Sequence, residues 1–146
     1  MGSIICEGAT NMSDFVAEIP FVQHLGMKAL VSDNGYSEIR LDIRPELLQR
    51  MGYVHGGAIA TLIDTSIGHA IYSTMENGGA VTIELKVNYL RPAQGTYLLA
   101  KTSLYHRGNT TAVGKTEVYD DQGKLVAVGM GTFMLLKPED HSPANA

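Results

Sequence analysis

The residues best suited to chemistry in this 146-residue chain lie in one short segment, 53–64. His55, Gly56 and Gly57 directly precede an apolar run that is predicted to be a helix, so the glycines stand at its first turn. Glycine costs stability there relative to alanine, which indicates that another group approaches the backbone closely. The first N–H groups of a helix lack partners within it and stabilise negative charge. They would suit an oxyanion that develops at a carbonyl carbon, although glycine pairs at turns are more often structural.

A carboxylate follows on the same predicted helix. Asp64 shares a helical face with small and apolar residues: Gly57, Ala60, Ile67, Gly68 and Ile71. A charged group on such a face is costly unless it is paired or functional. Asp64 is therefore a candidate general base or nucleophile. The alternative is an aspartate that bonds to neighbouring backbone or points into solvent.

The other histidines do not extend this candidate site. Asp64 and His69 have the Asp-x4-His spacing used by hydratases, but positions five apart on one helix lie about 140° apart and do not converge. The single cysteine, Cys6, excludes cysteine-based zinc sites. Three further histidines have no spacing typical of metal ligands: His24, His106 and His141. We therefore expect no bound metal.

Hydrophobic periodicity and turn residues predict the elements that must position this segment. The longest apolar run predicts a helix over His55–Met75. A short helix over Phe15–Leu25, capped by Ser13 or Asp14, is expected to be interrupted near Pro20. Strands are predicted at 27–32, 36–43, 81–90, 97–106, 110–119 and 125–136. In the third strand, alternation places four side chains on one face: Ile83, Leu85, Val87 and Tyr89.

This order of elements predicts an α+β fold, in which an antiparallel sheet of about six strands curls around one long central helix. The helix has more apolar surface than one concave sheet covers, so burial against a second subunit is expected. We divide the chain into a flexible N-terminal tail at 1–12, a single domain at 13–136 and a flexible C-terminal tail at 137–146.

Composition excludes several classes of protein. With 45% hydrophobic and 18% charged residues, the chain is not of the disordered class. A net charge of −4 without a Lys/Arg cluster argues against nucleic-acid binding. No apolar run is long enough to span a membrane, and the N-terminal stretch lacks the basic and apolar regions of a secretory signal. Together with the single cysteine, this predicts a cytoplasmic protein with no membrane partner.

Two motifs in combination resemble PaaI-type hotdog-fold acyl-CoA thioesterases. The first is Gly52-x-x-His55-Gly56-Gly57-x6-Asp64. The second is the strand segment 81–93, VTIELKVNYLRPA, which ends in Arg-Pro. The Arg107-Gly108 pair and the segment 121–133, DQGKLVAVGMGTF, are similar to that family too, so the resemblance runs from about residue 15 to residue 136.

The resemblance implies a hotdog fold and hydrolysis of an aryl- or medium-chain acyl-CoA to a carboxylic acid and CoA. No cofactor is implied, since CoA is part of the substrate. Asp64 corresponds to the carboxylate that activates water or attacks the thioester across a dimer interface. Gly56 corresponds to the backbone donor that polarises the thioester carbonyl from the facing subunit, with His55 and Gly57 shaping that turn. Thr82 corresponds to the hydroxyl that helps to place the water.

The resemblance also implies a CoA site and an assembly. Relatives hold the CoA nucleotide and phosphates at positions that correspond to Arg91, Arg107, Gly108 and Asn109, although the loop here is less basic. Gln49 stands where the family often has an asparagine that donates to the thioester carbonyl. The implied active unit is a homodimer, assembled as a dimer of dimers. Two alternatives stay open: a non-catalytic acyl-CoA-binding hotdog module and a hotdog dehydratase or hydratase.

Overall fold

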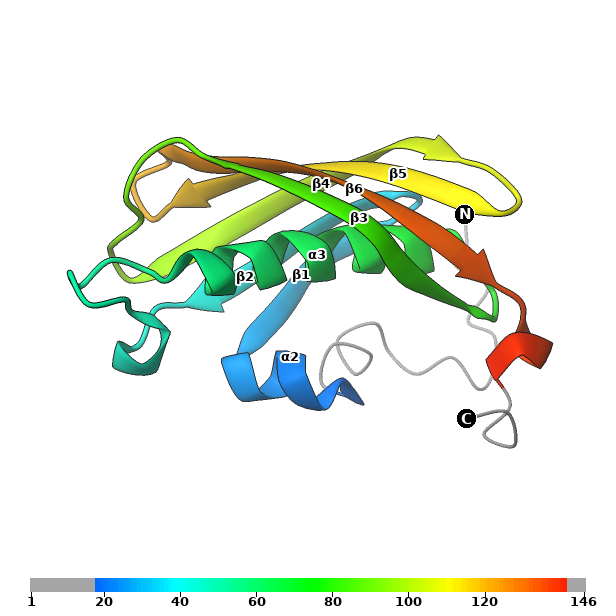
Figure 1. Cartoon of the computed structure of the whole chain (residues 1–146), viewed down its shortest axis with the longest axis horizontal. Coiled ribbons are helices and arrows are strands. Elements are labelled where there is room, and N and C mark those ends of the chain that lie inside the picture. The colour runs from blue at the N-terminus through cyan, green and yellow to red at the C-terminus, as the bar shows by residue number, and fades with distance from the viewer. Residues whose placement is uncertain (1–17, 142–146) are drawn as a thin grey trace, which may run out of the picture.

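Six strands form one antiparallel sheet in the computed structural model, which describes residues 18–141 (Figure 1). The order across the sheet is β1-β2-β4-β5-β6-β3, so β1 and β3 are its two edges. The strands are β1 (Met27–Asp33), β2 (Tyr36–Asp42), β3 (Gly79–Tyr89), β4 (Tyr97–Arg107), β5 (Thr111–Asp120) and β6 (Leu125–Leu136). Each predicted strand is confirmed to within two residues at either end.

Helix α3 (Gly56–Tyr72) lies against the concave face of the curled sheet (Figure 1). The fold is therefore the predicted α+β hotdog arrangement. The helix ends three residues before the predicted Met75. Two hydroxyls after it turn back onto the last carbonyls: Ser73 Oγ donates to Ala70 O at 2.6 Å and Thr74 Oγ1 donates to Ile71 O at 2.7 Å. Such bonds compete with the next helical hydrogen bonds and end the helix.

The core lies between α3 and the sheet. Leu62, Ile63 and Ile67 are completely buried on the helix. Ile67 approaches the sheet at Gly114, and Ile63 approaches it at Gly129. An added Cβ on either glycine would lie 2.7 Å from the methyl group of that isoleucine.

Four hydroxyl groups also lie within this core. Thr102 Oγ1 donates to Ser66 Oγ at 2.7 Å and lies 2.6 Å from Thr116 Oγ1. Ser37 Oγ donates to the Ser66 carbonyl at 2.7 Å. All four residues are completely buried. Because buried polar groups are costly unless paired, this network favours one position of α3 on the sheet.

Helix α2 (Pro20–Leu25) lies on the same side of the sheet as α3 (Figure 1). It begins at Pro20 after an extended Ile19 and ends at Gly26, whose φ of 76° suits glycine. The second part of the predicted helix is thus confirmed from Pro20 to Leu25, whereas Phe15 lies outside the described residues. The expected caps Ser13 and Asp14 lie outside the described residues. The 3-10 helices η1 (Pro45–Leu47) and η2 (Pro138–His141) complete the fold, and the domain boundaries stay a prediction.

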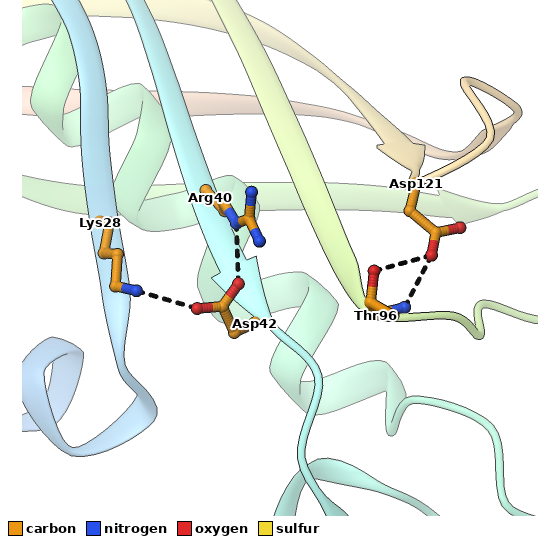
Figure 2. Close-up of polar contacts among 5 residues, drawn as sticks. All are labelled: Lys28, Arg40, Asp42, Thr96 and Asp121. Atoms are coloured by element: carbon orange, nitrogen blue, oxygen red, sulfur yellow. Dashed lines mark hydrogen bonds and ion pairs between the residues drawn. The ribbon is translucent and has the colours of Figure 1, made fainter.

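Two carboxylates hold the strand ends near the start of α3, as Figure 2 shows. Asp121 Oδ2 accepts from both the N–H and the Oγ1 of Thr96 at 2.8 Å, and these bonds lower the pKa of Asp121. Asp42 accepts from Lys28 at 2.9 Å and Arg40 at 2.7 Å, and both bonds lower its pKa. The first contact ties the connection before β4 to the β5–β6 turn. That connection in turn pairs with the loop before α3, through Val54 N–H and Ala93 O at 2.9 Å.

Candidate active site

The start of α3 is capped by a histidine. His55 Nδ1 accepts from Gly57 N–H at 2.8 Å, and His55 O accepts from Ala58 N–H at 2.9 Å. The Gly57 N–H is therefore used within the turn. Among residues 18–141, no acceptor takes the Gly56 N–H. The N–H of Gly56 is thus available to bind an oxyanion, as predicted for this turn. The hydrogen bond between His55 and Gly57 holds the backbone of the turn in place.

A tyrosine from the edge strand covers this turn. Tyr89 Oη donates to Gly56 O at 2.7 Å, and a Cβ on Gly56 would lie only 3.2 Å from the Tyr89 ring. A side chain on residue 56 would push the Tyr89 ring back by a few tenths of an ångström, so glycine favours this close approach. Sequence reasoning missed Tyr89 as a site residue. Its place on the helix-facing side of β3 was predictable, but nothing in the sequence links it to Gly56.

Asp64 lies two turns further along α3 and is half-buried. Thr82 Oγ1 donates to Asp64 Oδ1 at 2.7 Å, so the structure brings these two predicted residues together. No cation within the described part of the chain lies at ion-pair distance from Asp64. The structure therefore disfavours the alternative of an aspartate bonded only to neighbouring backbone.

A β-bulge in β3 makes the contact with Thr82 possible. The register with β6 shifts between Thr82 and Glu84, so the strand gains one residue there. As a result Thr82 and Leu85 both face α3, whereas Ile83 is 54% exposed. The prediction from alternation that Ile83 shares a face with Leu85 was wrong, because the bulge interrupts the two-residue period.

A cavity of about 420 Å³ opens beside Asp64, between α2, α3 and β3. The lining is mainly apolar, as expected for a site that takes a hydrocarbon group. Its walls come from α3 (Ala60, Thr61, Asp64, Thr65, Gly68, His69, Tyr72), from the α2 region (Ile19, Phe21, Val22) and from the sheet (Ala80, Thr82, Leu85, Phe133).

A single chain does not bring Gly56 and Asp64 to one point. They lie eight residues apart on the continuous helix α3, which places them about 12 Å apart along its axis. One small reacting group cannot contact both of them.

The remaining predicted residues are spread over the two ends of the sheet. Gln49 Oε1 accepts from the Met51 N–H, so the side-chain oxygen is held within its own loop. Arg91 is exposed just beyond β3, near the start of α3. Arg107 ends β4 at the opposite end, where its Nε donates to Thr74 Oγ1 at 2.8 Å. Gly108 and Asn109 form the turn that follows.

His69 lies deeper along the same cavity and is 2% exposed. Burial lowers its pKa, so the folded protein favours the neutral imidazole. The unfolded chain takes up the proton near pH 6.5, so it binds more protons than the folded chain below that pH. The free energy of unfolding therefore decreases as the pH falls below about 6.5.

We expect His69→Gln to reduce this acid sensitivity. Thermal melts followed by circular dichroism between pH 5 and pH 7 should show a smaller fall of Tm for the variant than for the wild type. The exposed His106 provides the control, and His106→Gln should keep the wild-type slope. Equal slopes for His69→Gln and the wild type would contradict the expected effect of burial.

Residues 18–141 contain no cluster of three potential metal ligands, and no helix among them is long and apolar enough to cross a membrane.

Comparison with known proteins decides the family. The model of the Thioesterase superfamily matches residues 51–127, which include the start of α3, Asp64 and β3. The chain belongs to this superfamily. A protein of Halobacterium salinarum that carries the name esterase is 31% identical over 145 residues, which cover 91% of this chain and 95% of the relative. The medium/long-chain acyl-CoA thioesterase YigI of Escherichia coli K12 is 27% identical, over 83% of this chain and 88% of that protein.

Solved structures share the fold. The PaaI protein from the phenylacetic acid degradation operon of Escherichia coli superimposes with a TM-score of 0.80, over 86% of this chain and 90% of that chain, at 24% identity. This likeness concerns the fold alone. With the superfamily match, it confirms the resemblance to PaaI-type hotdog thioesterases that the two sequence motifs indicated.

Proposed function

We propose that this protein hydrolyses aryl- or medium-chain acyl-CoA thioesters to a carboxylic acid and free CoA. The observation that carries the proposal is the carboxylate of Asp64, held by Thr82 and bordering a mainly apolar cavity without a cationic partner among the described residues. Superfamily membership and the acyl-CoA thioesterase activity named for the YigI relatives support the same reaction.

Asp64 has one oxygen engaged and one available for chemistry. Since Thr82 bonds to Oδ1, Oδ2 is left to take a proton from an attacking water or to attack the thioester carbon itself. In either case the carbonyl oxygen gains negative charge, which the Gly56 N–H at the start of a helix stabilises. The CoA thiolate then leaves and takes up a proton. Where Asp64 itself has attacked, water then hydrolyses the acyl-aspartyl anhydride, which releases the carboxylic acid and restores the carboxylate.

The two halves of this machinery meet in a two-fold dimer formed through β3. Within residues 18–141 this strand is a sheet edge with an unpaired side, and it exposes Val81 and Ile83. Long apolar edge strands are typical sites of association. Thr82 contacts Asp64 near one end of β3, whereas Tyr89 contacts Gly56 near the other.

Antiparallel pairing of β3 with its copy therefore joins the two halves. A two-fold axis between Leu85 and Lys86 sets Thr82 opposite the partner subunit's Tyr89, with both side chains on the helix side. Asp64 then faces the partner subunit's Gly56, and the dimer has two equivalent sites.

The same pairing gives a CoA site with residues from both subunits. Arg91 and Arg107 lie at opposite ends of one sheet, but antiparallel pairing brings the partner subunit's Arg91 to the end that carries Arg107, Gly108 and Asn109. Arginine suits the phosphates of CoA. We place the protein in the cytoplasm and its subunits in a dimer of dimers. Light scattering measures the assembly directly.

A thiol-release assay with a panel of aryl- and alkyl-CoA substrates tests the proposed reaction. Release of free CoA by the purified protein supports the proposal. Tight acyl-CoA binding without release would instead assign the chain to the non-catalytic binding modules. An enoyl-CoA is added to the panel, and loss of its double bond without thiol release would assign the chain to the hydratases.

The reaction is proposed to need no metal or added cofactor. Asp64 and the Gly56 N–H supply the base or nucleophile and the oxyanion donor, and the described residues hold no cluster of metal ligands. We expect dialysis against EDTA to leave the rate of thiol release unchanged. A loss of activity that a divalent cation restores would contradict this expectation.

A further inference from the structure

Gly68 stands in the middle of α3 without a structural need for glycine. Its φ lies outside the left-handed region. The nearest atom to an added Cβ would be Phe133 Cε1 at 3.8 Å, an ordinary van der Waals contact. At Gly114, by contrast, a Cβ would lie 2.7 Å from Ile67. Since glycine destabilises a helix interior relative to alanine, neither backbone geometry nor packing explains Gly68.

The position of Gly68 supplies a reason. It lines the Asp64 cavity four residues beyond Asp64, which is one turn or about 6 Å along the helix. Tyr72 lies a further turn along and also lines the cavity. A side chain at position 68 would therefore occupy space between the carboxylate and the far end of the cavity.

We propose that Gly68 determines acyl-chain length by keeping this passage open for a straight, saturated acyl chain. This inference rests on the proposed thioesterase function. Asp64 and Tyr72 are about 12 Å apart along α3. An extended chain covers about 1.2 Å per bond, so the passage accommodates about ten carbon atoms beyond the reacting carbonyl. Leu85 and Phe133 provide apolar contacts on the sheet side.

The test compares Gly68→Ala and Gly68→Leu with the wild type on butyryl-, hexanoyl-, octanoyl- and decanoyl-CoA. For Gly68→Ala we expect the ratio of kcat/KM for decanoyl-CoA to that for butyryl-CoA to fall about tenfold or more, because one methyl group in an apolar pocket has an effect of that size. Gly68→Leu should lower the ratio further. The Tm of Gly68→Ala should rise by about 2–4 °C, an effect opposite to that of replacing a glycine needed for packing.

Gly114→Ala is the matched control, because it adds the same methyl group where Ile67 already fills the space. It should lower the Tm and leave the chain-length ratio as in the wild type. A ratio for Gly68→Ala within twofold of the wild type overturns the inference, as does a wild type that accepts aryl groups but no alkyl chain beyond butyryl. A wild type without thiol release on any acyl-CoA overturns the proposed function instead.

Discussion

Replacing Asp64 with asparagine is expected to lower kcat for thiol release by about 10³-fold or more. Asparagine has the same shape and keeps an oxygen that accepts from the Thr82 hydroxyl, so the helix and the cavity should be preserved. It is neither a base nor a nucleophile at neutral pH. Steady-state kinetics with the best substrate of the acyl-CoA panel measure the loss, and an unchanged Tm shows that the fold is intact.

Asp33→Asn is the control for this substitution, since Asp33 is an exposed aspartate at the end of β1, away from the cavity. It should retain the wild-type rate. If Asp64→Asn keeps more than about a tenth of the wild-type kcat, Asp64 is not the reacting group. The thioester would then have to be attacked from another part of the cavity.

Mixing two inactive variants is expected to restore about half of the wild-type activity. One subunit carries Asp64→Asn and the other carries Gly56→Pro, which removes the N–H of Gly56; Gly56 is the first residue of α3 and His55 before it is extended, so proline is tolerated there. In the mixed dimer, the intact Asp64 of one chain faces the intact Gly56 of the other. One active site therefore has both residues intact, whereas the second active site has both residues substituted. Each parent homodimer has one lesion in every site and should be inactive.

A second mixed dimer serves as the control. Here both substitutions lie on one chain, and the partner is wild type. If sites are shared between subunits, each site has one lesion and this dimer is inactive. If each site lies within one chain, the wild-type subunit keeps half of the activity. Different affinity tags on the two chains allow each mixed dimer to be isolated before thiol release is measured. Activity confined to the second mixed dimer would refute a shared site.

The helices and strands of the fold could be predicted from the amino-acid sequence. Alternation of apolar residues, turn residues such as Asn34-Gly35 and the apolar run after His55 are local signals, and local signals fix strands and helices. They also limited the architecture to a curled antiparallel sheet around one helix, because four consecutive strands at hairpin spacing leave few other arrangements. The candidate residues Gly56 and Asp64 could likewise be found, since glycine and aspartate are unexpected on that apolar helix.

The contacts of these residues could not be predicted in this way, because they depend on how distant segments pack together. Thr82 reaches Asp64 across 18 positions of sequence, and Tyr89 reaches Gly56 across 33. The first contact depends on the bulge in β3, which arises from the pairing with β6. The alternation of apolar and polar residues in the sequence does not indicate this bulge. The role proposed for Gly68 could not be predicted from the sequence either. Whether a glycine lies in a tight contact or beside open space depends on atoms that other elements bring close to it. The periodicity of apolar residues indicates which face of a helix or strand a side chain lies on. Its contacts depend on the packing between segments that are distant in the sequence.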